Sequence, residues 1–237
     1  MRFSVVIPAY NEEDWIRIAL NGLKNQNFDD YEIIVVVGGD DSTYDIAKEY
    51  TNKVYREPPK TRGPAAARNF GAKKARGEIV AFIDADTWPN PNWLKAYDAC
   101  FSKGVVGAGG PVYANSPSLY LRFIFWLDQD LLYRISSAIG FHQFSGNNCA
   151  YDRKAFLAVG GFNEETSMLE DVELANRMKS QGKEVFCPKA WVRTSTRRFE
   201  EEGFWRTFYK NMVGYWGLFK KGRAEVEYFR VWKKGKK

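Results

Sequence analysis

The chain has few of the residues that build metal centres or disulfide networks. Its 237 residues include three cysteines, Cys100, Cys149 and Cys187, and a single histidine, His142. These residues lie far apart along the sequence, which excludes zinc-finger spacing and makes a disulfide framework improbable. A reducing cytosol is therefore the simplest compartment.

Long apolar runs and a secretory leader are missing as well. No window approaches ~18 uninterrupted apolar residues, so we expect no membrane-spanning helix within these residues. Residues 1–8 (MRFSVVIP) lack the charged region, apolar stretch and cleavage site of a signal peptide, and they predict a first strand instead. A hydrophobic content of 45% is still enough to bury a substantial core.

The two common phosphate-binding loops do not occur after that strand. Residues 8–13 (PAYNEE) contain neither G-x-G-x-x-G nor G-x-x-x-x-G-K-[ST], which disfavours a dehydrogenase or a P-loop ATPase.

Basic residues are concentrated at the end of the chain. Residues 193–237 carry 13 lysines and arginines against five acidic residues, a net charge of +8, whereas residues 1–192 carry −2. The overall charge of +6 therefore comes from a basic tail.

Short apolar runs rich in β-branched residues alternate with helical patterns over the first part of the chain. Strands are predicted over residues 3–7, 33–37, 78–83 and 105–108. Helices are predicted over residues 12–24, 42–50 and 65–75, and from about Asn92. This order predicts an α/β fold in which helices cover both faces of a mostly parallel sheet, with ligands at the carboxyl ends of the strands.

The alternation becomes irregular after residue 110. Apolar residues recur at a helical period over residues 118–140, a second helix is predicted over 170–180, and a strand over 184–187.

Two carboxylates, Asp84 and Asp86, follow the third predicted strand with one residue between them. A D-x-D triplet alone more often falls on a solvated loop by chance, but this one emerges at the ligand edge of the sheet. Mg²⁺ and Mn²⁺ prefer oxygen ligands and take one or two carboxylates while phosphates complete the shell. The triplet therefore predicts a divalent-cation site that holds a diphosphate leaving group.

A second acidic pair, Glu170 and Asp171, opens the helix at 170–180. Both carboxylates complement the positive end of the helix dipole, so helix stabilisation is the simpler interpretation. Adjacent helix residues point about 100° apart, so one can face a cleft while the other turns elsewhere. Spacing does not decide which of the two faces a substrate.

Four motifs follow one another in a fixed order. They are residues 5–13 (VVIPAYNEE), residues 63–71 (GPAAARNFG), Asp84-Ala85-Asp86, and the group formed by residues 146–148, 160–164 and 170–171 (GNN, GGFNE and ED). Together they resemble the inverting family 2 glycosyltransferases of GT-A fold, over roughly residues 3–190. In that family the motifs are, in turn, the nucleotide-binding turn, the segment before the metal strand, the D-x-D, and the acceptor side with its E-D motif.

The resemblance implies a role for each matching residue. Asp86 would bind the Mn²⁺ or Mg²⁺ that bridges the donor diphosphate, Asp84 would support the metal or the ribose, and Asp171 would be the general base. The nucleotide side of the site would comprise Pro8, Ala9, Tyr10, Glu12 and Arg68.

The chain departs from the family after the second strand. Many members carry an acidic residue there, in a V-D-D-G-S or V-D-G-G-S context, that contacts the base. Residues 35–43 are VVVGGDDST, so one alignment puts Val37 at that position and another lets Asp40 fill it. Whether the donor is UDP- or GDP-linked stays open.

Further residues are candidates for the acceptor side. We assign Trp88, Asn147, Asn148, Glu170, Arg197 and Arg198 to it. Trp88 could stack on a sugar or simply pack, and His142 could border the pocket, although a single histidine is more often structural.

The tail shows a pattern typical of a helix at a membrane interface. Over residues 204–219 one side carries Trp205, Phe208, Met212, Trp216 and Phe219, and another carries Arg206 and Lys210, with Lys220 and Lys221 beyond. The aromatic helix at 118–140 could join it. No nucleic-acid partner is predicted, because no nucleic-acid-binding module is recognised.

The sequence therefore predicts a metal-dependent inverting glycosyltransferase, peripheral on the cytoplasmic face of the cell membrane. It would move a sugar from a nucleotide sugar to a lipid-linked or glycan acceptor. Residues 1–192 would form the catalytic domain, with a donor half (1–110) and an acceptor half (111–192), and residues 193–237 a basic amphipathic helical tail.

Two rivals remain: a sugar-phosphate nucleotidyltransferase of related fold, and a non-catalytic membrane-associated binding protein. The Glu170-Asp171 pair argues against the first, and retention of Asp84, Asp86, Arg68 and Asp171 argues against the second.

Overall fold

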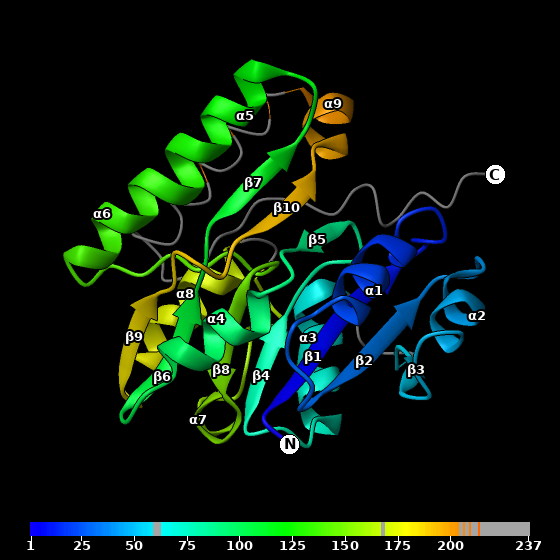
Figure 1. Cartoon of the computed structure of the whole chain (residues 1–237), viewed down its shortest axis with the longest axis horizontal. Coiled ribbons are helices and arrows are strands. Elements are labelled where there is room, and N and C mark those ends of the chain that lie inside the picture. The colour runs from blue at the N-terminus through cyan, green and yellow to red at the C-terminus, as the bar shows by residue number, and fades with distance from the viewer. Residues whose placement is uncertain (59–62, 167–168, 204–205, 207–208, 210–212, 214–237) are drawn as a thin grey trace.

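A seven-stranded central sheet organises the molecule. The structure is a computed structural model that describes residues 1–58, 63–166, 169–203, 206, 209 and 213. The strands follow the order β3-β2-β1-β4-β8-β6-β9, and helices lie on both sides of them (Figure 1). The predicted α/β architecture with a mostly parallel sheet is confirmed.

The first four strands are mutually parallel. They are β1 (Phe3–Tyr10), β2 (Tyr31–Gly38), β3 (Val54–Arg56) and β4 (Ile79–Phe82). Because parallel strands end at the same edge of a sheet, the residues that follow them meet there. This edge receives Asn11 and Glu12, Gly39 and Asp40, Glu57, and the D-x-D triplet.

The second half of the chain completes the same sheet. Strand β8 (Cys149–Asp152) runs antiparallel to both β4 and β6 (Val105–Gly109), and β9 (Lys183–Phe186) runs parallel to β6. The sequence did not predict β8, because four residues without clear alternation give little strand signal. The insertion of β8 means that residues 1–110 and 111–192 share one sheet.

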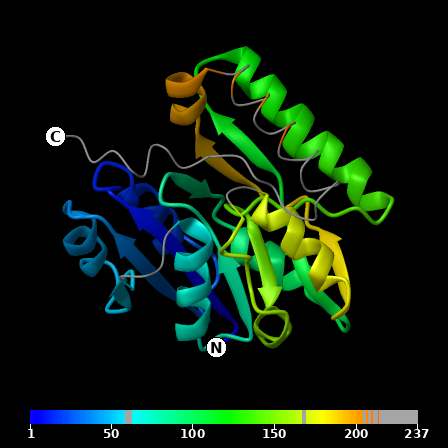
Figure 2. The same ribbon diagram turned by 180° about the vertical axis from the view of Figure 1, so that it is seen from behind.

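Helices cover both faces of the sheet, so β1 is buried on both of its faces. Phe3, Val5 and Ile7 face α1 (Ile16–Lys24), α2 (Thr43–Lys48) and α4 (Trp93–Cys100). Val6 faces the opposite layer, which consists of α3 (Pro64–Lys74), α7 (Arg153–Ala158) and α8 (Glu170–Met178). Figure 2 shows α3 and α8 on this second face.

A small second sheet stands beyond the ligand edge. It has the order β5-β10-β7, formed by β5 (Thr87–Pro89), β10 (Val192–Ser195) and β7 (Val112–Asn115). Strand β10 crosses the expected boundary between residues 192 and 193, so its residues belong structurally with β5 and β7. The division into domains stays a prediction.

The helix predicted over 118–140 consists of three consecutive segments. They are α5 (Leu119–Trp126), the π-helical η1 (Leu127–Leu132) and α6 (Tyr133–Ala138), and α9 (Arg197–Glu202) follows β10. The helix predicted from residue 12 begins only at Ile16, because Asn11 has a positive φ of 51° and residues 12–15 form a turn.

The structure corrects the expectation for the cysteines. Cys100, at the end of α4, and Cys187, just after β9, form a disulfide with a Cα–Cα distance of 6.3 Å. Their 87-residue separation hides this proximity in the sequence. The cysteine content therefore no longer argues for a reducing compartment. The third cysteine, Cys149, is free and buried.

The predicted membrane-interface helix falls mostly outside the described residues. Trp205, Phe208, Lys210, Met212, Trp216, Phe219, Lys220 and Lys221 are not among them. Within the described part of the chain, no helix combines the length and the apolarity needed to cross a bilayer.

Candidate active site

Arg68 joins the two acidic motifs, which lie far apart in the sequence. Its guanidinium, on α3, lies 2.8 Å from Asp84 Oδ1 and 3.0 Å from Glu170 Oε1. Arg68 is only 4% exposed, so two carboxylates are needed to offset the cost of burying its charge. The nucleotide-side segment, the D-x-D and the E-D motif therefore meet at one place.

Asn69, the next residue on α3, fixes the GGFNE segment. Its amide donates to the Phe162 carbonyl oxygen at 2.8 Å and to a Glu164 carboxylate oxygen at 2.9 Å, and its Oδ1 accepts from the Phe162 N–H at 2.8 Å. With three hydrogen bonds this side chain holds two segments together that are distant in the sequence.

Asp171 has a partly buried carboxyl group at the start of α8. Oδ2 accepts from the Gly146 N–H at 2.9 Å and Oδ1 accepts from the Val172 N–H at 2.9 Å. Burial, reinforced by the charge of Glu170, raises the pKa of Asp171 to about 7. A carboxyl with a pKa near neutrality and a fixed orientation can accept and release a proton at physiological pH.

Asp86 and Glu12 share an arginine from the C-terminal side of the chain. Arg197, on α9, lies 3.1 Å from Asp86 Oδ2 and 2.5 Å from Glu12 Oε1, and its guanidinium packs over the Trp15 ring at 5.1 Å. Burial raises the pKa of Asp86 to about 6 and that of Glu12 to about 7, although Arg197 opposes both shifts. Arg197 therefore lies with the predicted metal carboxylate, not with the residues assigned to the acceptor side.

The predicted nucleotide side lies at the ends of β1 and β2. Pro8 and Ala9 are buried within β1, and Tyr10 ends it, partly exposed. Asp40 is exposed, and its N–H donates to Asn11 Oδ1 at 3.0 Å. Val37, the alternative position for the missing base-contacting acid, is 1% exposed in the core.

Glu57, which directly follows β3 at the same edge, was not predicted from the sequence. A side-chain carbon added at Gly38 would collide with Glu57 Oε2 and with the Tyr10 ring, so these groups converge over that glycine. Glu57 Oε1 is buried and has no hydrogen-bond partner among the described residues, and burial raises the Glu57 pKa to about 7. Only recognition of the three-residue β3 could have revealed this position from the sequence.

One acceptor-side assignment is wrong. The Asn148 side chain is fully buried; its Oδ1 accepts from Trp93 Nε1 and the Tyr97 hydroxyl, and its Nδ2 donates to two backbone carbonyl oxygens. All its hydrogen-bonding capacity is used in the core, so no substrate can contact it.

The other assignments are on more open positions. Asn147, Trp88 and Arg198 are all partly exposed. His142 is also partly exposed, and its Nδ1 lies 2.9 Å from the Ser137 hydroxyl oxygen. Burial lowers the His142 pKa, which favours the neutral ring of a structural histidine.

Comparisons with known proteins identify the family of the chain. The family model described as "Glycosyl transferase family 2" matches residues 4–160. A putative glycosyltransferase, EpsH of Bacillus subtilis, is 42% identical over 96 residues, covering 39% of this chain and 28% of EpsH. TarS of Staphylococcus aureus, a poly(ribitol-phosphate) β-N-acetylglucosaminyltransferase, is 35% identical over 158 residues, covering 56% of this chain and 28% of TarS. The chain thus spans under a third of either relative.

Solved structures share the fold. The mannosyltransferase PcManGT of Pyrobaculum calidifontis, in complex with GDP-Man and Mn²⁺, aligns with a TM-score of 0.73 at 21% identity, covering 94% of this chain and 66% of that one. Residues 1–349 of S. aureus TarS, in complex with UDP-GlcNAc, align with a TM-score of 0.70 at 22% identity, covering 96% and 68%. From the family match and the architecture together, the chain belongs to glycosyl transferase family 2 and has the GT-A fold.

Proposed function

We propose that this protein transfers a sugar from a UDP- or GDP-linked donor to a lipid-linked or glycan acceptor, with inversion at the anomeric carbon and with Mn²⁺ or Mg²⁺ bound. One observation carries the proposal: the partly buried Asp171, with its pKa raised to about 7, lies in the same cluster as Arg68, Glu170 and the D-x-D triplet. The UDP-GlcNAc and GDP-Man complexes of the two structural relatives support a nucleotide-sugar donor.

The residues present fit a small, hard cation. Asp86 offers a carboxylate, and Glu12 Oε2 is buried with no hydrogen-bond partner in the described part of the chain. In the part of the chain that the structure describes, no group of three or more His, Cys, Asp or Glu side chains could hold a metal by itself. This suits a cation that takes one or two carboxylates and leaves its other positions to phosphate oxygens.

In this proposal Asp86 holds the ion and Asp84 supports it. Bound there, the ion would neutralise the charge that develops on the departing diphosphate. Arg197 adds a fixed positive charge beside the same carboxylates. Arg68, tied to Asp84 and Glu170, keeps the acidic side chains at the spacing that the site requires.

Asp171 is the proposed general base. Its carboxylate accepts the proton of an acceptor hydroxyl while that oxygen forms a bond to the anomeric carbon. The bond from this carbon to the diphosphate breaks at the same time, and the nucleoside diphosphate leaves with the electron pair. A single displacement of this kind inverts the anomeric centre. The hydrogen bonds from Gly146 and Val172 hold the base in one orientation during the transfer.

We further propose that Tyr10 and Glu57 line the base pocket. Uracil and guanine both present a ring N–H, and Glu57 Oε1, which has no hydrogen-bond partner among the described residues, is an acceptor for such a group. Glu57 would thereby take the place of the family's acidic residue after the second strand. This leaves the choice between UDP and GDP open.

The membrane contact and the cytoplasmic location belong to the same proposal. Support comes from the net charge of +8 over residues 193–237 and from exposed apolar side chains on α5 and α6.

Thermal-shift titration and product analysis test the function. Nucleoside diphosphates and nucleotide sugars are added with and without Mn²⁺. We expect the ligands that carry one nucleobase, uracil or guanine, to raise the melting temperature in a Mn²⁺-dependent way. NMR of the product should show an anomeric configuration opposite to that of the donor. Stabilisation by nucleoside triphosphates with pyrophosphate release would instead indicate the nucleotidyltransferase, and donor binding without turnover the binding protein.

A further inference from the structure

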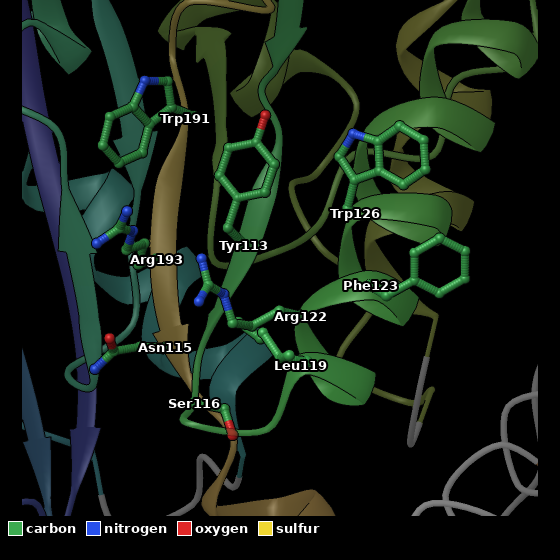
Figure 3. A pocket seen from close by; sticks show the side chains of 10 residues that line it. Tyr113, Asn115, Ser116, Leu119, Arg122, Phe123, Trp126, Trp191 and Arg193 are labelled. Atoms are coloured by element: carbon green, nitrogen blue, oxygen red, sulfur yellow. The ribbon is translucent and has the colours of Figure 1, made fainter.

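A pocket of about 580 Å³ lies outside the cluster described above. It opens between α5 and the strands β7 and β10, as Figure 3 shows. The residues that matter for its chemistry are Tyr113, Arg122, Phe123, Trp126, Trp191 and Arg193. None of them takes part in the proposed transfer step.

Two positive charges in this pocket have no carboxylate partner among the residues that the structure describes. Arg122, on α5, and Arg193, on β10, are both exposed, and neither forms an ion pair with a carboxylate of the described residues. Arg193 packs over the Trp191 ring at 5.7 Å. The nearby Asp130 is already engaged, because it accepts from the Tyr113 hydroxyl and pairs with Arg134. An anion could therefore bind both guanidinium groups without displacing a carboxylate.

The helix α5 that carries Arg122 also presents exposed apolar side chains to the pocket. Leu119 is 76% exposed, Phe123 56% and Trp126 42%. The exposed apolar side chains continue beyond the pocket along η1 and α6 at Leu132, Ile135 and Ile139. Exposed apolar side chains of this size cost free energy in water and favour contact with an apolar chain.

The pocket is connected to the catalytic edge through β10. Arg193 is the register partner of Trp88 on β5, and the Ser195 N–H donates to the Asp86 carbonyl oxygen at 3.2 Å. A ligand held by Arg193 is therefore two residues along one strand from the backbone that positions Asp86. This suits a group attached to the acceptor, beside its reacting hydroxyl.

We propose that this pocket binds the phosphate group of a lipid-linked acceptor, with Arg122 and Arg193 on the phosphate and the attached alkyl chain on Phe123, Trp126 and Leu119. The inference rests on the proposed function, since it assigns the acceptor class of the same enzyme. The exposed apolar side chains favour a lipid phosphate over a soluble sugar or polyol phosphate, which would leave them in water.

Calorimetry on the full chain tests the pocket without any donor. The probe is decyl phosphate below its critical micelle concentration. Two comparison ligands are used: decanol, which lacks the phosphate, and glycerol 3-phosphate, which lacks the long alkyl chain. We expect decyl phosphate to bind more tightly than either. Arg122→Gln and Arg193→Gln should each weaken it about tenfold, the effect of losing one charge-assisted hydrogen bond.

One further variant tests the apolar side chains of the pocket, and a second variant serves as a control. Trp126→Ala should weaken decyl phosphate and leave inorganic phosphate unchanged, because only the chain contacts Trp126. Lys154→Gln, which removes an exposed charge on α7 far from α5, is the matched control and should bind like the wild type. Melting curves should show all four variants folded, since neither arginine forms an ion pair among the described residues.

Three results would overturn the proposal. They are equal affinity for decyl phosphate and decanol, equal affinity for decyl phosphate and glycerol 3-phosphate, and unchanged binding in both arginine variants. Mn²⁺-dependent nucleotide binding, measured on the same samples, tells this failure from that of the proposed function. If nucleotide binds and decyl phosphate does not, only the proposal for the pocket is wrong. If decyl phosphate binds and nucleotide does not, only the proposed nucleotide-sugar donor is wrong.

Discussion

Replacing Asp171 by asparagine tests the proposed base most directly. The side chain keeps its shape, but the amide cannot accept the proton of the acceptor hydroxyl. We expect donor binding to persist and transfer to fall about 10²–10⁴-fold, the usual contribution of general acid–base catalysis. In the wild type, the rate should rise with pH and level off above about 7, because Asp171 must be ionised to act and its pKa is raised to about 7.

The same substitution should change stability in a pH-dependent way. The pKa of Asp171 is raised from its usual 3.8 to about 7, so the folded protein holds this proton more tightly than the unfolded chain. The associated stability is fully present below about pH 4 and is lost as the pH rises through about 7. A pKa shift of this size changes the free energy of unfolding by about 4 kcal/mol in total. On the order of 2 kcal/mol of this change takes place between about pH 5 and about pH 8.

The amide of the Asp171→Asn variant does not ionise, so this pH dependence should disappear. The amide also turns one N–H towards a backbone N–H donor, at a cost of about 1–3 kcal/mol that does not vary with pH. The melting temperature of the variant relative to the wild type should therefore rise by about 4–8 °C between those two pH values.

Kinetics and melting curves from about pH 5 to about pH 8 test both expectations. Asp152→Asn is the matched control: Asp152 caps α7, where asparagine serves equally well, and it should change neither quantity. Transfer at the wild-type rate would remove Asp171 as the base and point to Glu170. A stability difference that does not vary with pH would refute the argument from its burial.

Three other substitutions probe the remaining parts of the site. Asp86→Ala should abolish the Mn²⁺-dependent gain in nucleotide affinity measured by calorimetry, and an undiminished gain would remove Asp86 from the metal shell. Arg68→Lys should lower the melting temperature, because an ammonium cannot contact Asp84 and Glu170 as the planar guanidinium does; a loss of about 1–3 kcal/mol is expected, and none for Arg17→Lys at an exposed pair. Glu57→Gln should weaken UDP or GDP about tenfold and leave Mn²⁺-pyrophosphate binding unchanged, and an equal loss for both ligands would contradict a contact with the base.

Much of the site could be predicted because parallel strands bring their ends together. Asp84 and Asp86 follow a short β-branched run, and this local pattern was enough to place them at the ligand edge of a sheet. The order of the motifs, from the PAYNEE turn to Glu170-Asp171, was enough to indicate the family. Asn148 was misjudged because a motif match does not tell a core amide from one that faces a cleft.

The sequence by itself determined the alternation of strands and helices, the acidic motifs and the basic tail, because each depends on residues that are neighbours in the chain. Tertiary structure alone decided that Arg68 links Asp84 to Glu170, that Arg197 pairs with Asp86, and that Cys100 meets Cys187. It also placed Glu57 at the ligand edge, and Arg122 and Arg193 in one pocket. These contacts join residues far apart in sequence, and they follow from strand order and helix packing, which no local pattern of residues specifies.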